Sequence, residues 1–105
     1  MDVFEANQSA WDRAARQGNP YAQPVSAEGV SEARQGRWRI HLSDTKPVPR
    51  EWLGDVDGRR ILCLAGGGGQ QGPILAAAGA QVVVVDASSG QLAQDQAVAE
   101  RDGLD

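Results

Sequence analysis

The sequence predicts an α/β fold, because two apolar runs of strand length alternate with segments that read as helices. These runs are residues 61–65 and 81–85, and four consecutive glycines follow the first of them directly. Alternation of strands and helices implies a parallel sheet with right-handed crossovers. All five aromatic residues lie before Gly58. We therefore expect a helical and loop-rich N-terminal extension over residues 1–57 and a sheet-forming part over residues 58–105.

Length and charge exclude several classes of protein. The chain has 105 residues, which is room for one small domain. Its net charge of −4 gives no electrostatic footprint for nucleic acid or an anionic membrane, so neither is expected as a partner. The single cysteine, Cys63, excludes an internal disulfide framework and a cysteine-based zinc cluster, and no metal site is expected. A cytoplasmic location fits this cysteine usage and the absence of a signal-peptide pattern in residues 1–10.

One uncharged stretch, residues 61–85, is long enough to span a bilayer. The glycines, a proline and several glutamines interrupt it, and its apolar pieces are short. We interpret it as a buried strand, a tight loop, a packed helix and a second buried strand.

The N-terminal extension is expected to contain two short helices. Asn7 is a candidate N-cap for a helix that carries Trp11 and ends near Gly18. Ser26 can cap a second helix, which Gly36 would end.

The rest of the extension reads as turns and extended chain. Residues 38–42 alternate like a short strand or an extended linker, and residues 47–53 suggest an extended approach into one helical turn. A turn follows at residues 57–58. The three tryptophans of this part are expected to anchor the core: Trp11, Trp38 and Trp52.

The second part is expected to form two helices beside the strands. A helix that has Pro73 in its first turn and carries the apolar residues 74–78 follows the glycines, and Gly79 ends it. The strand over residues 81–85 ends at Asp86. Ser88 and Gln91 form a capping-box pattern that opens another helix.

The junction of strand, glycines and helix predicts a ligand site. Glycines allow positive φ angles and let a ligand approach the backbone closely. The N-terminus of the following helix offers free N–H groups. The carboxylate of Asp86 would lie at the end of the neighbouring strand, where it can accept both hydroxyls of a ribose. The predicted ligand is therefore a nucleoside-containing cofactor, bound across the strand ends.

Two classes of cofactor fit these features. Residues 67–72 match G-x-G-x-x-G, the fingerprint of an NAD(P) or FAD oxidoreductase. That register places its ribose acid a few residues beyond Asp86, near Gly90, where the chain has no acid. The first fingerprint glycine also usually follows the strand directly, and here Ala65 and Gly66 occupy that place.

The other register resembles the first two motifs of class I S-adenosylmethionine-dependent methyltransferases. Residues 61–69 are similar to the first motif, and residues 82–89 are similar to the second. Three residues take the glycine places of the first motif: Ala65, Gly67 and Gly69. The interval from Ala65 to Asp86, 21 residues (86 − 65), suits this family. The N-terminal aromatic segments are similar to those that precede the first motif in one bacterial subgroup.

This resemblance implies a partial Rossmann-like fold, with S-adenosylmethionine as the cofactor and an unidentified small molecule as methyl acceptor. It also implies which residues contact the cofactor: Ala65, Gly66, Gly67, Gly69, Asp86 and Ala87. Tyr21 is added as a pocket-lining candidate because it lies in a proline-bounded loop. Cys63 departs from the family, which usually has an acid there that helps to hold the methionine ammonium group.

The resemblance ends before the segments that carry the acceptor-side residues of the family, so no catalytic residue is assigned. We expect the first half of a domain about twice this length, inactive by itself. A non-enzymatic chain that keeps only a binding fold is the remaining alternative. Two parallel strands bury little apolar surface, so marginal stability, self-association or partial disorder is expected.

Overall fold

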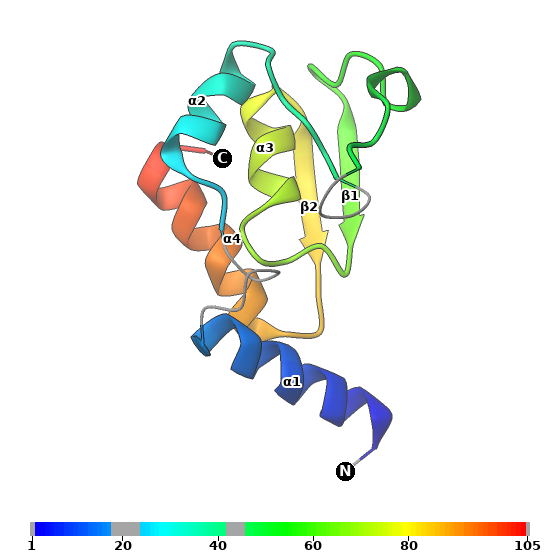
Figure 1. The fold of residues 1–105 in the computed structure, drawn as a ribbon, viewed down its shortest axis with the longest axis vertical. Coiled ribbons are helices and arrows are strands. Elements are labelled where there is room, and N and C mark those ends of the chain that lie inside the picture. Colours follow the sequence, from blue (N-terminus) through cyan, green and yellow to red (C-terminus); the bar gives the residue numbers. More distant parts are fainter. Residues whose placement is uncertain (1, 18–23, 42–45, 105) are drawn as a thin grey trace.

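The computed structural model describes residues 2–17, 24–41 and 46–104, and it has the expected α/β architecture (Figure 1). Strands β1 (Arg60–Leu64) and β2 (Gln81–Val85) pair in parallel. Helix α3 (Gln71–Ala77) connects them, and helix α4 (Ser89–Asp102) follows β2. This order is compatible with a partial Rossmann-like unit.

The N-terminal part is helical, but its first helix begins earlier than predicted. Helix α1 (Val3–Gln17) is preceded by Asp2, whose carboxylate accepts a hydrogen bond from the backbone N–H of Glu5 at 2.7 Å. Asp2 therefore acts as the N-cap, and the role predicted for Asn7 is wrong because Asn7 lies inside the helix. Asp and Asn are equally good caps, so residue type alone did not distinguish the two positions.

Helix α2 (Ala27–Arg34) begins and ends as predicted. The hydroxyl of Ser26 accepts a hydrogen bond from the backbone N–H of Gly29 at 3.1 Å. Beyond the helix, Gly36 has a φ of 85°, a conformation that favours glycine over other residues.

The chain from α2 to β1 is extended and does not join the sheet. The only pairing described there is an isolated antiparallel bridge between His41 and Pro47. The extended-linker alternative is thus confirmed over residues 38–41, and the strand alternative is wrong there. A 3-10 turn, η2 (Arg50–Trp52), follows Pro49 as predicted.

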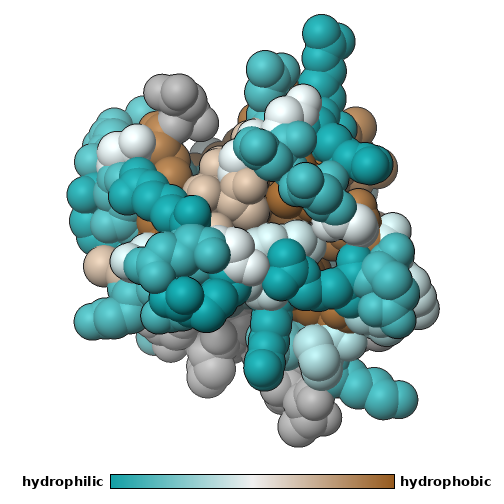
Figure 2. Space-filling model, turned by 90° about the horizontal axis from the view of Figure 1, so that it is seen from above, coloured by the Kyte–Doolittle hydropathy of each residue, from teal (hydrophilic) through white to brown (hydrophobic). Residues whose placement is uncertain are grey.

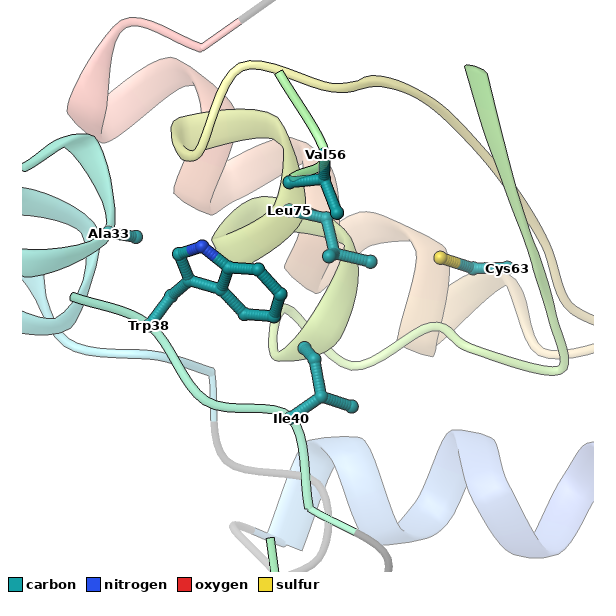
Figure 3. Packing of buried hydrophobic residues seen from close by; sticks show 6 residues of the cluster. All are labelled: Ala33, Trp38, Ile40, Val56, Cys63 and Leu75. Atoms are coloured by element: carbon teal, nitrogen blue, oxygen red, sulfur yellow. The ribbon is translucent and has the colours of Figure 1, made fainter. Parts of the chain in front are cut away.

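The core lies between α2, α3 and β1 (Figure 3). Trp38 is its largest side chain and is only 7% exposed. The indole lies between Ala33 of α2 and Leu75 of α3, with Ile40 beside it. Cys63 extends into the same core from β1. The two parts predicted from the sequence therefore share one core.

Only one of the three tryptophans anchors this core. Trp11 is 45% exposed and Trp52 is 66% exposed, so the predicted core role is wrong for both. Trp52 lies in a short 3-10 turn, and Trp11 lies on a helix that buries none of residues 3–17.

The described elements cover only one face of the sheet. Figure 1 shows α2, α3 and α4 gathered on one side of the strands. Four apolar side chains on the other face are 51–72% exposed: Leu62, Leu64, Val83 and Val85. The prediction of fully buried strands is therefore wrong for these residues. An unbroken apolar run is typical of strands covered on both faces, and here no described element covers the second face.

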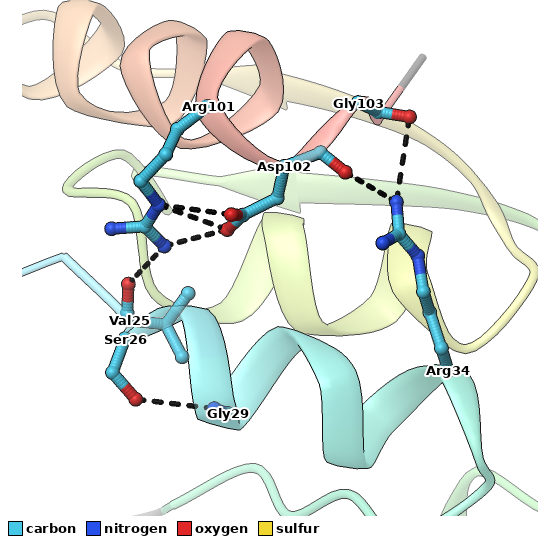
Figure 4. Close-up of polar contacts among 7 residues, drawn as sticks. All are labelled: Val25, Ser26, Gly29, Arg34, Arg101, Asp102 and Gly103. Atoms are coloured by element: carbon cyan, nitrogen blue, oxygen red, sulfur yellow. Dashed lines mark hydrogen bonds and ion pairs between the residues drawn. The ribbon is translucent and has the colours of Figure 1, made fainter.

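The end of α4 is tied to the start and end of α2 (Figure 4). Arg101 donates a hydrogen bond to the backbone oxygen of Val25 at 2.8 Å and pairs with Asp102 at 2.6 Å. Arg34 of α2 donates to the backbone oxygen of Asp102. Gly103 ends α4 with a φ of 68°. These contacts fix α2 and α4 relative to one another.

Seen from above, at the amino ends of the strands, apolar residues show between hydrophilic side chains (Figure 2).

No helix within the described ranges is long and apolar enough to cross a membrane.

Candidate functional site

Two loops meet at the carboxyl ends of the strands, facing α1 (Figure 1). We call residues 65–70, which follow β1, the glycine loop, and residues 86–88, which follow β2, the acid loop. Ala65 has a φ of 52°. This left-handed conformation costs a residue with a β-carbon about 1 kcal/mol. The backbone therefore explains why the resembled motif has glycine at this position.

The amides of three consecutive glycines donate to the protein itself. The N–H of Gly67 donates to Oδ2 of Asp86 at 2.9 Å. The N–H of Gly68 donates to the backbone oxygen of Gln91 at 2.9 Å, and that of Gly69 donates to Oδ1 of Asp95 at 3.0 Å. The glycine loop is thus bonded to the acid loop and to α4, and these three N–H groups already have acceptors.

Gly67 lies where no side chain fits. A β-carbon there would be 2.9 Å from Cβ of Gln91, which is too close for a real contact, and 3.0 Å from Oδ2 of Asp86, which is tighter than most. The close approach of the two loops therefore requires glycine at this position.

Asp86 joins the two loops. Its Oδ2 accepts from Gly67, and its Oδ1 accepts from the backbone N–H of Ser88 at 2.9 Å. An ionised carboxylate has about four acceptor sites, so each oxygen of Asp86 can accept one more hydrogen bond. The side chain is half-buried and lines a pocket.

Helix α1 is attached to the acid loop and to α4 by polar contacts. Gln8 donates to the backbone oxygen of Ala87 at 2.8 Å. Oδ1 of Asp12 accepts from the hydroxyl of Ser88 and from the backbone N–H of Gly90, the latter at 3.0 Å. These hydrogen bonds, led by that from Ser88, hold the pKa of Asp12 below its ordinary value, because they favour the charged form.

A pocket of about 630 Å³ lies between α1 and the two loops. This volume is within the range of about 300–1,000 Å³ typical of small-molecule sites. Phe4 and Trp11 of α1 line one wall, and Ala65, Asp86 and Ala87 line the opposite one. The pocket therefore offers aromatic surface on one side and hydrogen-bond acceptors on the other.

Among the described residues, three buried oxygens near this junction have no hydrogen-bond donor: Oε1 of Gln91, Oε1 of Gln94 and Oδ2 of Asp95. Gln91 lines the pocket and is only 4% exposed. Burial raises the pKa of Asp95, and the amides of Gly69 and Gly68 partly offset that rise. Of these three residues only Gln91 lines the pocket, and a ligand with a hydrogen-bond donor would suit its oxygen.

Cys63 lies in the core and is not part of the pocket lining. Burial, with a smaller contribution from Asp95, raises the pKa of its thiol. The thiol is therefore uncharged near neutral pH, and it provides no charge at the position where the resembled family has an acid.

The structure brings five of the predicted cofactor contacts together in the pocket lining: Ala65, Gly66, Gly67, Asp86 and Ala87. Gly69 is instead buried against Pro24 and α4, outside that lining. Tyr21 lies outside the described residues. The cofactor contacts of all seven residues stay predictions.

Sequence reasoning missed four polar residues of this junction: Gln8, Asp12, Gln91 as a pocket residue, and Asp95. Asp12 and Ser88 are 76 positions apart, and no local pattern indicates that they meet. Asp95 is separated from the glycine loop by helix α3, strand β2 and part of α4, so its contact with Gly69 is equally non-local.

The structure is thus an α/β unit, compatible with a partial Rossmann-like unit, with a pocket of small-molecule size at the carboxyl ends of its strands. One curated protein is similar over nearly the whole chain. It is the "uncharacterized methyltransferase YbaJ" of Bacillus subtilis (strain 168), with 48% identity over 98 residues, which are 93% of this chain and 38% of that protein. The chain therefore spans about 38% of the length of this relative. No protein-family model matches the chain.

Proposed function

We propose that this chain is the cofactor-binding part of an S-adenosylmethionine-dependent methyltransferase. The name of the similar Bacillus protein supports a methyltransferase at the level of the enzyme class. The 21-residue interval from Ala65 to Asp86 supports the choice of cofactor, as do the acceptors of Asp86 and Gln91 in the pocket lining. When bound, S-adenosylmethionine supplies a methyl group already activated by its sulfonium sulfur.

The observation that carries this proposal is the engagement of the glycine amides. A dinucleotide fingerprint offers its loop amides to a pyrophosphate. Here the amides of Gly67 and Gly69 donate to the carboxylates of Asp86 and Asp95, which would also repel a phosphate. A cationic ligand with hydroxyl donors suits the carboxylate of Asp86, which lines the pocket, so the oxidoreductase alternative is not favoured.

The residues of the site have distinct proposed roles. Each oxygen of Asp86 would accept one ribose hydroxyl in addition to its present donor. Ala65 and Gly66 would contribute backbone carbonyls, and Oε1 of Gln91 would accept from a donor of the cofactor. Phe4 and Trp11 would cover the open side of the pocket and keep water away from the sulfonium methyl.

Domain boundaries and catalysis belong to the same proposal. Residues 58–105 would form the first βαβα units of the cofactor domain, and residues 1–57 would precede it as an extension. The acceptor would bind to parts of a longer protein that this chain does not include. We propose accordingly that these 105 residues transfer no methyl group alone, and that the whole enzyme acts in the cytoplasm.

Calorimetric titration of the chain with S-adenosylhomocysteine and with NAD tests the function. We expect binding of the first ligand and none of the second. Asp86→Ala should weaken S-adenosylhomocysteine binding at least about tenfold, because hydrogen bonds to a charged group are lost. Glu100→Ala, which removes an exposed acid of α4 outside the pocket, is the matched control. Binding of NAD alone would contradict the proposal.

A further inference from the structure

We propose that Asp12 of α1 is a positioning residue, which acts through Ser88 to hold the ribose-binding carboxylate of Asp86 in place. The identity of the ligand in this inference rests on the proposed function, whereas the contacts themselves do not.

Ser88 connects the two carboxylates. It is a polar residue only 1% exposed, so its hydrogen bonds are shielded from water. Its hydroxyl donates to Oδ1 of Asp12 and accepts from the backbone N–H of Gln91 at 3.1 Å. Its backbone N–H donates to Oδ1 of Asp86 at 2.9 Å. The contacts thus run without a gap from α1 to the carboxylate that faces the pocket.

Asp12 also holds the first turn of α4. The same oxygen, Oδ1, accepts from the hydroxyl of Ser88 and from the backbone N–H of Gly90, on either side of Ser89. Two acceptor contacts across three successive residues restrict the acid loop at its junction with the helix. Without Asp12, the Ser88 hydroxyl and the Gly90 amide lose their acceptor in a partly buried place, where an unpaired donor is costly.

Asp86 depends on this restriction, because its other oxygen bonds to the glycine loop. A shift of Ser88 would move Oδ1 of Asp86, and with it the contact of Oδ2 with Gly67. Asp12 carries the only charged side chain among the described contacts between α1 and the acid loop or α4; the others come from Gln8 and Gln94. The N-terminal helix is therefore expected to be part of the ribose-binding arrangement.

The test compares Asp12→Ala, Asp12→Ser and Asp12→Asn, with Glu5→Ala as the control for loss of one acid on α1. Alanine removes the acceptor and serine is too short to reach Ser88, whereas asparagine keeps an oxygen at the position of Oδ1. The probes are S-adenosylhomocysteine and its 2′-deoxyribose analogue. Wild type should prefer the ribose form by about tenfold or more, since Asp86 accepts from the hydroxyls.

Asp12→Ala and Asp12→Ser should bind S-adenosylhomocysteine about tenfold more weakly and lose most of the preference for ribose. Asp12→Asn and Glu5→Ala should retain both. A general structural defect would weaken both probes equally and leave their ratio unchanged, and that result would overturn the inference.

A ligand-free measurement separates this inference from the proposed function. The backbone amide signals of Gly67 and Ser88 in a nuclear magnetic resonance spectrum should shift in Asp12→Ala and Asp12→Ser but not in Glu5→Ala. Unshifted signals would contradict the positioning role, whatever the ligand. A wild-type chain that binds neither probe would contradict the proposed function, and the amide signals would then decide the role of Asp12 alone.

Discussion

The two N-terminal helices are attached to the molecule by opposite means. Helix α2 has eight residues, and it buries Val30 and Ala33 completely while Trp38 packs against it. Helix α1 has fifteen residues and buries none of them. Its described side-chain hydrogen bonds, such as those of Gln8 and Asp12, join it to the acid loop and α4. Helix length therefore does not indicate how firmly a helix is anchored.

The difference separates a scaffold helix from a site helix. Apolar burial attaches α2 to the core whether or not the pocket is filled. The polar contacts of α1 hold only while the acid loop and the start of α4 keep their positions. A perturbation of the core should therefore be felt by α2, and a perturbation of the pocket by α1.

The largest expected effect is on stability, and it distinguishes the buried Trp38 from the exposed Trp11 and Trp52. Trp38→Ala should lower the free energy of unfolding by about 3–5 kcal/mol, because it empties the core between α2 and α3. Trp11→Ala on α1 and Trp52→Ala, both at exposed positions, should cost less than about 1 kcal/mol. Urea unfolding followed by circular dichroism measures all three. A cost for Trp11→Ala equal to that of Trp38→Ala would mean that apolar contacts anchor α1 after all.

Hydrogen exchange compares the two helices directly. Amides of α1 should exchange on the order of a hundredfold faster than those of α2, because α1 has no buried side chain of its own, whereas α2 buries Val30 and Ala33. S-adenosylhomocysteine should slow exchange in α1 much more than in α2, since the helix and the ligand share the pocket. Equal protection of both helices in the ligand-free chain would contradict the distinction between scaffold and site helix.

The pH dependence of stability should distinguish Asp12, which attaches α1, from Asp95, which bonds to the glycine loop. Burial raises the pKa of Asp95 above its ordinary value of 3.8, so its stabilising contribution is full below pH 3.8 and is lost as pH rises through the raised value. The pKa of Asp12 is lowered, so its contribution is present above pH 3.8 and is lost as pH falls through the lowered value.

Both expectations are tested by denaturant unfolding over a series of pH values. The proteins compared are wild type, Asp95→Asn and Asp12→Asn. Relative to Asp95→Asn, wild type should lose stability as pH rises from 3.8. Relative to Asp12→Asn, it should lose stability as pH falls below 3.8. If wild type lost stability in the same pH direction relative to both variants, the two environments would not shift the pKa values of Asp12 and Asp95 in opposite directions.

The smallest expected effect on stability concerns Ala65, the residue that connects β1 to the glycine loop. Ala65→Gly should raise the free energy of unfolding by up to about 1 kcal/mol, because glycine adopts the φ of 52° without steric cost. Ala93→Gly, at an exposed position inside α4, should lower it by about 0.5–1 kcal/mol. Thermal unfolding compares the two. A loss of stability in both variants would mean that the backbone of Ala65 is not strained.

Local patterns predicted the elements of this fold well. Strands, glycine loop and helices follow from residues close together in the chain, as the caps at Ser26 and Ser88 illustrate. Other features depend on contacts between distant residues. The exposure of Trp11, the bare face of the sheet and the contact of Asp95 with Gly69 could not be predicted, because the sequence does not indicate what covers a surface.

The candidate site likewise has one part that local patterns predicted and one part that they did not. The sequence indicated the glycine loop and Asp86, which carry their own local signals. The wall formed by α1, with Phe4 and Gln8, carried none, nor did Asp12 behind it.

The 76 positions between Asp12 and Ser88 have a consequence for the order of assembly. During synthesis α1 leaves the ribosome first, but its hydrogen-bonding partners on the acid loop and α4 are made near the end of this segment. Helix α2 meets Trp38 within a few residues of its own end and can begin to pack much sooner. Closing the long loop to α1 is a late, non-local step. The pocket should accordingly be the last part of this structure to form.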